Sequence, residues 1–194
     1  MEVTEIDQRI VAKLTYAKAI LDVGCGDGRL TFYLARETSR EIIGIDVSRS
    51  GFRKAKRHAN LAGLGHLVRC LEGDARHLEF ADGRFDAVIL SYSLHHIEDG
   101  PAALREIRRV LRPSGTIVVC EHELTEGETP GGCHQFTLAG LTKCIVEAGF
   151  EDVRWERSDG DILLFGEKQE AGLVQGLPSG VQEPGRQMRQ EVAV

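Results

Sequence analysis

The chain has 194 residues and a formal net charge of −6, with 42% hydrophobic and 28% charged residues. This length suits one domain, and the composition is that of an ordinary globular protein. The negative charge argues against non-specific binding to a nucleic-acid backbone, and the longest apolar runs are too short to span a bilayer. The N-terminus lacks the pattern of a signal peptide, so we expect a cytoplasmic protein.

The five cysteines are scattered along the chain and form no C-x-x-C pair. Their odd number and their spacing argue against both a disulfide framework and a zinc ribbon. We therefore expect buried, reduced thiols.

The first half of the chain alternates two patterns. Apolar residues at helical spacing predict helices over residues 5–15, 28–37 and 49–62. Short apolar runs predict buried strands over residues 19–23, 41–46 and 66–72.

The second half continues this alternation. Strands are expected over 85–90 and 116–120, and helices over 100–111 and 137–148. Pro113-Ser114-Gly115 is expected to separate the first of these helices from the strand that follows. Two last strands, at about 150–157 and 161–167, flank an Asp-Gly pair that predicts a hairpin.

Strands that alternate with helices imply an α/β fold with a doubly wound, mostly parallel sheet. The terminal hairpin requires one antiparallel strand near an end of the sheet. Beyond about residue 168 the pattern fails, and Gly, Gln, Pro and Glu dominate. We therefore expect one domain over residues 1–168 and a disordered tail over 169–194.

The first candidate site is the run Asp22-Val23-Gly24-Cys25-Gly26-Asp27-Gly28, between a predicted strand and a predicted helix. Glycines there allow a sharp turn and close approach of a ligand to the backbone. The helix N-terminus that follows favours an anionic group. The glycine spacing differs from the dinucleotide fingerprint, because Arg29 stands where its last glycine would be. Asp22 suits a ligand that carries a cation beside its carboxylate, and a turn that serves packing alone is the alternative.

Asp46 closes the second predicted strand, and Asp74 follows the third. A carboxylate at Asp46 could accept hydrogen bonds from ribose hydroxyls, and one at Asp74 from an adenine amino group. Each alone could be a helix cap or a turn residue. Three acidic residues at the ends of three consecutive strands indicate instead a ligand crevice along one edge of the sheet.

These residues and several further runs resemble the class I S-adenosylmethionine-dependent methyltransferases, in particular the small-molecule group that includes ubiquinone-biosynthesis-like enzymes. The first run extends over Ile20 to Gly28, and four others match the family in order and spacing: Gly44 to Ser48, Gly73 to Ala75, Phe85 to His96, and Leu104 to Gly115. The resemblance covers about residues 18–167. It implies a Rossmann-like, seven-stranded sheet of order 3-2-1-4-5-7-6, with strand 7 antiparallel.

The resemblance also implies roles for nine residues around S-adenosyl-L-methionine. Asp22 would lie near the methionine amine, with the backbone of Gly24, Cys25 and Gly26 along the cofactor. Asp46 would bind the ribose, and Val47, Asp74 and Ala75 would contact the adenine. The backbone of Ser91 would lie near the amine and the transferable methyl. S-adenosyl-L-homocysteine would be the product.

A base is needed only if the acceptor must lose a proton, because the sulfonium is already activated. The tentative candidates are His95, His96 and His122, all on loops at the ligand edge. Packing roles are the alternative for these histidines. A metal held by His122, Glu121 or Glu123, Cys133 and His134 matches no established zinc spacing, so we expect no metal site.

The favoured function is methyl transfer to a small or medium-sized acceptor through an O, N, C or S atom. A catalytically silent cofactor-binding or scaffold protein remains an alternative, as does a protein or RNA substrate. A nicotinamide oxidoreductase is disfavoured by the glycine spacing. The basic helix over 49–62 is expected to be a solvated face rather than an RNA site. Few segments cover the site, so a second copy of the chain could close it as a homodimer.

Overall fold

The computed structural model describes residues 3–124 and 136–169. The strands in these ranges are β1 (Ile20–Val23), β2 (Ile42–Asp46), β3 (Val68–Glu72), β4 (Phe85–Ser91), β5 (Leu111–His122), β6 (Phe150–Ser158) and β7 (Asp161–Lys168). The α-helices are α1 (Glu5–Lys13), α2 (Arg29–Thr38), α3 (Phe52–Leu61), α4 (Gly100–Val110) and α5 (Leu138–Glu147), with short 3-10 helices η1 (Arg49–Gly51) and η2 (Leu94–His96).

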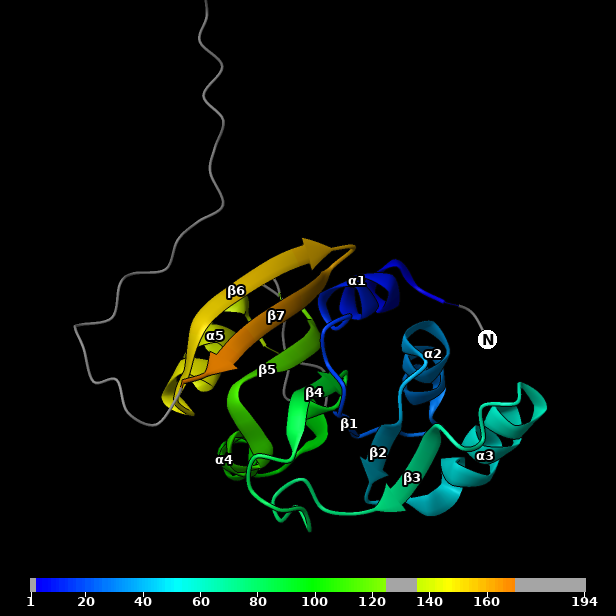
Figure 1. Cartoon of the computed structure of the whole chain (residues 1–194). Coiled ribbons are helices and arrows are strands. Elements are labelled where there is room, and N and C mark those ends of the chain that lie inside the picture. The colour runs from blue at the N-terminus through cyan, green and yellow to red at the C-terminus, as the bar shows by residue number, and fades with distance from the viewer. Residues whose placement is uncertain (1–2, 125–135, 170–194) are drawn as a thin grey trace, which may run out of the picture.

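The strands form one sheet of order β3-β2-β1-β4-β5-β7-β6 (Figure 1). Strands β1 to β5 pair in parallel, and β7 runs antiparallel to both β5 and β6. The β6–β7 hairpin turns through Asp159 and Gly160, at φ values of 50° and 87°. Two successive left-handed residues match the right-handed twist of a two-residue hairpin. The expected order, antiparallel strand and hairpin are confirmed.

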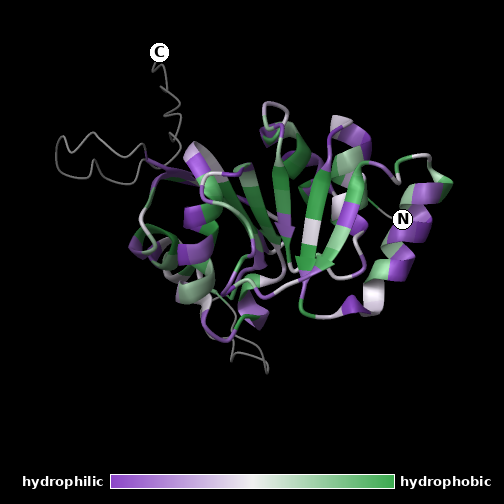
Figure 2. Cartoon of the chain, turned by 60° about the horizontal axis from the view of Figure 1, so that its bottom comes forward, coloured by the Kyte–Doolittle hydropathy of each residue, from purple (hydrophilic) through white to green (hydrophobic). Residues whose placement is uncertain are grey.

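Helices cover both faces of the sheet, which is apolar on each. On β4, Ala87 and Ile89 belong to the core cluster under α1 and α2, whereas Val88 and Leu90 belong to the cluster under α4 and α5. This alternation is the two-residue period of a strand that is buried on both faces. Figure 2 shows the central strands as mostly hydrophobic, with hydrophilic residues gathered on the helices.

The expected start of the fifth strand was wrong. The strand β5 begins at Leu111 directly after α4, and the Pro-Ser-Gly run lies inside it as an irregularity in the pairing with β4. Ser114 has a φ of 59°, which is the kind of left-handed residue that a β-bulge can contain. The sequence signal marked a real break in regular structure, but the break is a bulge in the strand and not the connection to it.

The described cysteines, Cys25, Cys70, Cys120 and Cys144, are free thiols. Within residues 3–124 and 136–169, no helix is long and apolar enough to cross a membrane. Cys133 and the expected tail beyond Gln169 lie outside the described residues.

Candidate cofactor and active site

A cavity of about 610 Å³ opens at the carboxyl ends of the central strands. It lies beside the neighbouring strands β1 and β4, where the order of the strands in the sheet reverses direction. Open α/β sheets bind their ligands at this point. The sequence-predicted residues that line it are Gly24, Gly26, Asp46, Val47, Asp74, Ala75 and His96. The predicted residues Asp22, Cys25, Ser91, His95 and His122 are outside this lining.

The Gly-rich turn forms one wall of the cavity. The amides of Gly24 and Cys25 both donate to the carbonyl oxygen of Ile45, at 2.8 and 2.9 Å, and so attach the turn to β2. A Cβ on Gly24 would lie 2.4 Å from the Cβ of Ser93, so this glycine is needed for packing. A Cβ on Gly26 would meet no protein atom within 4 Å. Gly26 therefore borders open space, as expected for close approach of a ligand to the backbone.

Asp46 is held rigidly at the edge of this wall. Its two carboxylate oxygens accept hydrogen bonds from the amides of Gly26 and Ser48, each at 2.9 Å. Charge-assisted bonds of this kind fix the carboxylate, while its other lone pairs stay available for ribose hydroxyls. Val47, next in sequence, is 71% exposed and offers an apolar surface at the mouth.

Asp22 lies beneath the turn rather than on the cavity surface. It is 2% exposed, and the hydroxyl of Thr31 donates to its carboxylate at 2.6 Å. Burial raises the pKa of Asp22 to about 6, despite the Thr31 hydrogen bond and the charge of Arg29. An ammonium group nearby would stabilise the ionised form of this carboxylate. Cys25 is buried outside the cavity lining and packs against Gly44, where an added Cβ would lie 2.8 Å from the Cys25 sulfur.

The opposite wall follows β3 and contains Gly73, Asp74, Ala75 and Arg76. The guanidinium of Arg76 forms a two-pronged ion pair with Asp74, with Nη2 donating to Oδ2 at 2.8 Å. This hydrogen bonding lowers the pKa of Asp74. An adenine amino group would therefore share this carboxylate with Arg76 or displace it.

The chain turns sharply after β4 to reach the cavity again. Tyr92 has a φ of 52°, and its amide donates to the carbonyl oxygen of Cys120 at 2.8 Å. The next residue, Ser93, donates its hydroxyl to the carbonyl oxygen of Val23 at 2.7 Å and so joins this turn to the Gly-rich wall. Ser91 ends β4, and its buried hydroxyl lacks a hydrogen-bond partner among the described residues. The left-handed backbone conformation of Tyr92 is strained for a non-glycine residue, and such strain is typical of functional sites.

His95 is oriented by a buried carboxylate. Glu121 is 1% exposed and accepts hydrogen bonds from the amides of Leu94 and His95 at 2.9 and 3.3 Å. Its second oxygen lies 2.5 Å from Nδ1 of His95. This contact leaves Nε2 as the ring nitrogen that can exchange a proton with another group. The ring of His96, which lines the cavity, has its centroid 4.0 Å from that of His95.

His122 has a similar but more exposed partner. Its Nδ1 lies 2.5 Å from Asp161, which also accepts a hydrogen bond from the Tyr92 hydroxyl at 2.5 Å. The His122 side chain is 67% exposed, against 16% for that of His95. Burial is the main reason why the pKa of Tyr92 is raised, so this hydroxyl stays protonated.

The structure places no cluster of three metal-ligating side chains within residues 3–124 and 136–169. Glu123, one of the suggested ligands, is instead paired with Arg157 at 2.6 Å. Cys133 and His134 lie outside the described residues.

Sequence reasoning did not single out several residues that line the cavity, namely Arg76, Tyr92, Ser93, Ile97 and Glu98. All of them lie within two positions of residues that were predicted, so the neighbours of each motif carried the missing signal. Asp161 had no such neighbour, because only the pairing of β7 with β5 brings it beside His122.

Comparison with known proteins agrees with this geometry. A family profile described as a methyltransferase domain matches residues 21–119. The chain is 41% identical over 105 residues to the demethylmenaquinone methyltransferase of Thermus thermophilus, which covers 54% of this chain and 47% of that protein. It is 37% identical over 102 residues to the methyltransferase GfsG of Streptomyces halstedii, which covers 53% of this chain and 37% of that protein. The matched segment is thus less than half the length of either relative.

Among solved structures, the cyclase SpnF superposes with a TM-score of 0.74 and 26% identity, over 85% of this chain and 82% of that chain. The Bacillus subtilis protein YcgJ superposes with a TM-score of 0.73 at 18% identity, over 87% of this chain and all (100%) of that chain, which supports the fold alone. The family profile, the sheet order and the cavity at its carboxyl edge together show that the chain belongs to the class I S-adenosylmethionine-dependent methyltransferases.

Proposed function

We propose that the protein transfers a methyl group from S-adenosyl-L-methionine to a small-molecule acceptor. The observation that carries this proposal is the cavity wall in which Gly26 borders open space while its amide holds the Asp46 carboxylate. A backbone free of side chains beside a fixed carboxylate suits a ligand with a ribose and a flat base.

The cofactor would run along the carboxyl edge of the sheet. Asp22 would balance the charge of the methionine amine through the floor of the turn, and the turn backbone at 24–26 would follow the methionine chain. Asp46 would bind the ribose hydroxyls, with the adenine between Val47 and the Asp74–Ala75 wall. Ser91, at the end of β4, would present its backbone near the reacting methyl.

When bound, the cofactor would supply a methyl group activated by its sulfonium sulfur, and the sulfur would keep the electron pair of the broken bond and leave as S-adenosyl-L-homocysteine once the acceptor had taken the methyl. If the acceptor carries a proton, Nε2 of His95 takes it, because Glu121 fixes the ring and stabilises the imidazolium that forms. His96 lines the cavity, its ring centroid lies 4.0 Å from that of His95, and it would contact the acceptor.

A small acceptor is supported by the similarity to a demethylmenaquinone methyltransferase. We would incubate the protein with cofactor carrying a labelled methyl and with separate acceptor sets: quinones and phenols, amines, thiols, peptides and RNA. Label in a small-molecule set supports the proposal, and label in peptides or RNA alone would replace it with a macromolecular substrate.

The role of the His95 pair is tested by Glu121→Gln, with Glu123→Gln as its matched control on the same strand end. We expect kcat to fall about 10–100-fold for the first, the scale of a weakened general base, with KM for the cofactor unchanged. The control should behave like wild type, because Glu123 faces Arg157. Equal kcat values for both variants would remove His95 from the reaction.

A second candidate is a protein that holds the cofactor without transferring its methyl. The resemblance at 26% identity to the cyclase SpnF favours this candidate. Tight cofactor binding with no labelled product in any acceptor set would support this candidate over methyl transfer.

A further inference from the structure

The connection from β3 to β4 lacks a covering helix, although it joins two strands that run in the same direction in one sheet. Residues 73–84 contain only turns, bends and isolated bridges, and the structure describes all of them. Parallel crossovers usually contain a helix that satisfies their backbone groups. Here the same connection also supplies the cavity wall from Gly73 to Arg76. The start of this wall is tied to β2, because the amide of Gly73 donates to the carbonyl oxygen of Asp46 at 3.0 Å. The stretch that continues the wall, from Leu78 to Asp82, has no such bond to a strand and has to be held by other means.

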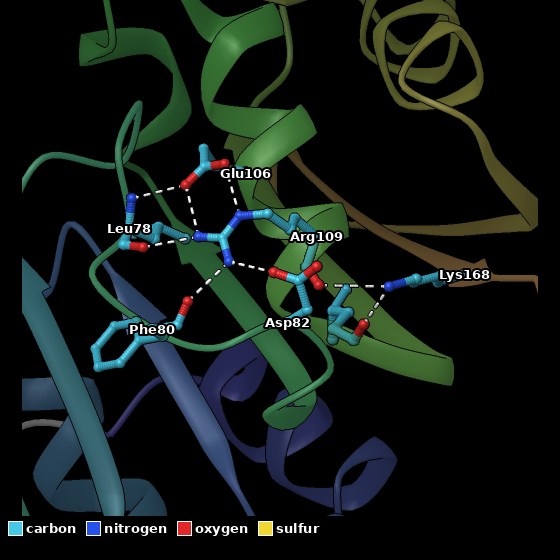
Figure 3. A network of polar contacts seen from close by, with 7 residues as sticks. Leu78, Phe80, Asp82, Glu106, Arg109 and Lys168 are labelled. Atoms are coloured by element: carbon cyan, nitrogen blue, oxygen red, sulfur yellow. Dashed lines mark hydrogen bonds and ion pairs between the residues drawn. The ribbon is translucent and has the colours of Figure 1, made fainter.

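Two side chains of α4, those of Arg109 and Glu106, hold the stretch that directly follows the wall (Figure 3). Nη2 of Arg109 donates to the carbonyl oxygen of Leu78 at 2.7 Å, and Nη1 donates to that of Phe80 at 2.8 Å. Nη1 also reaches the carboxylate of Asp82 at 2.7 Å. Glu106 accepts the amide of Leu78 at 2.9 Å and binds Nε and Nη2 of Arg109, both at 2.8 Å.

These contacts fix the connection along most of its length. The planar fork of Arg109 binds three acceptors of the connection and the Glu106 carboxylate in one geometry, which a flexible ammonium would not do. At the far end, the amide of Gly83 donates to the carbonyl oxygen of Arg109 at 3.0 Å. At the near end, the Leu78 side chain is 3% exposed and belongs to the core cluster. The ion pair with Arg109 lowers the pKa of Glu106 to about 2, so the pair stays charged at any ordinary pH.

Lys168 of β7 supports the same helix end. Its Nζ donates to the carbonyl oxygen of Leu111 at 2.5 Å and lies 3.4 Å from that of Arg109 (Figure 3). The end of α4 that carries Arg109 is therefore anchored to the sheet and offers a rigid support.

We propose that the Arg109–Glu106 pair is a positioning device for the adenine wall of the cofactor cavity, acting through Leu78 and Phe80 without touching the cofactor. This inference rests on the proposed function, because it assigns the Gly73–Arg76 wall to the adenine. Loss of the pair releases the connection, and the adenosine part of the cofactor then binds a wall that has to be ordered first.

The test compares Arg109→Met with Arg105→Met, which removes an exposed arginine from the same helix. Dissociation constants are measured by calorimetry for S-adenosylhomocysteine and for adenosine, at a temperature where each variant is folded by circular dichroism. Amide hydrogen exchange is followed over residues 73–80. We expect about a tenfold weaker binding of both ligands for Arg109→Met, with faster exchange, and wild-type values for the control. Arg109→Lys should bind both ligands nearly as weakly as Arg109→Met, because lysine keeps the charge but lacks the planar guanidinium.

A folded Arg109→Met variant with wild-type affinity for both ligands would overturn the proposal, even with a lower melting temperature, because it would show a structural role alone. If Arg109→Met does not fold, Glu106→Gln decides in the same way: weaker binding supports the positioning role, and unchanged binding overturns it. Failure of the wild-type chain to bind S-adenosylhomocysteine would instead remove the proposed function, and this inference with it.

Discussion

The two walls of the cavity are built by different means. The Gly-rich wall is held by backbone hydrogen bonds to Ile45 and by glycines packed against Ser93 and Ala55. The wall after β3 is continued by a stretch, Leu78 to Asp82, that is held by the side chains of Arg109 and Glu106 from a helix later in the chain. The first wall is therefore fixed by local residue types, and the second depends on the assembled fold. Substitutions in the first wall should change contacts with the cofactor directly. Substitutions that affect the second wall should weaken cofactor binding by making that wall less ordered.

Gly26→Val should give the largest effect. The new side chain projects into open space on the cavity side, so we expect no detectable cofactor binding while the fold survives. The residue has a φ of +53°, and the left-handed conformation costs a non-glycine residue about 1–2 kcal/mol. Calorimetry with S-adenosylhomocysteine and thermal unfolding would measure both effects.

Gly63→Val is the matched control, because Gly63 also has a positive φ and also has no atom within 4 Å of an added Cβ. It lies after α3 and does not line the cavity. Gly63→Val should lose about as much unfolding free energy as Gly26→Val and should keep the wild-type affinity for S-adenosylhomocysteine. Normal binding by Gly26→Val would disprove the direct role of the first wall.

Asp22→Asn should strengthen the fold and weaken the site. The pKa of Asp22 rises from an ordinary 3.8 to about 6 on folding, so the folded chain holds this proton more tightly than the unfolded chain. The contribution of this group to the free energy of unfolding therefore falls as the pH rises from about 4 to about 6. We expect the variant to exceed wild type by up to about 3 kcal/mol at pH 8 and to match it below pH 4.

Cofactor affinity should fall in the same variant, because the amine loses its counter-charge. Denaturant unfolding from pH 4 to pH 8 measures the first effect, and calorimetry the second. Asp27→Asn serves as a control of opposite sign, since the hydrogen bond from Lys54 lowers the pKa of Asp27. A less stable Asp22→Asn variant at pH 8 would refute the cost assigned to burial of the carboxylate.

Asp46→Ala should weaken cofactor binding by about 1–3 kcal/mol, the scale of hydrogen bonds to a charged group. The variant loses the ribose contacts and also the carboxylate that holds the amides of Gly26 and Ser48. Equilibrium titration with S-adenosylhomocysteine would measure it. Unchanged affinity would reject the ribose role of Asp46.

Asp74→Ala should have the smallest effect, about threefold in affinity. Its carboxylate is exposed to solvent and already paired with Arg76, and such pairs exchange partners at little net gain. The same titration applies. A loss as large as that of Asp46→Ala would show that the second wall binds the adenine directly and strongly, and would weaken the contrast between the walls.

The fold was predictable because its signals are local. Every strand that the apolar runs indicated is present, and Asp159-Gly160 marks the terminal hairpin through backbone conformations that few other residues adopt. The β5 bulge was not predictable, since Pro113 to Gly115 read equally well as a loop until the pairing with β4 is known. Residue types reveal that a break occurs, and long-range pairing decides its form.

The residues of the cavity that lie together in one short stretch of sequence were predictable, and the pairs formed between distant stretches were not. The glycines and Asp46 are recognisable because one turn and one strand end contain them. The Glu121–His95 pair and the Arg109 network join side chains that lie more than one element apart in sequence, so their pairing follows only from the sheet order. The burial of Asp22 beneath the turn, with its raised pKa, likewise depends on how Thr31 of α2 packs over β1.

The central claim is that this chain binds S-adenosylmethionine in the cavity between the two walls. Calorimetric titration of the purified chain with S-adenosylmethionine, S-adenosylhomocysteine and NADH tests it most directly. We expect binding of the first two in the micromolar range, on the order of −8 kcal/mol, and none of NADH. Binding of NADH alone, or of none of the three, would contradict it.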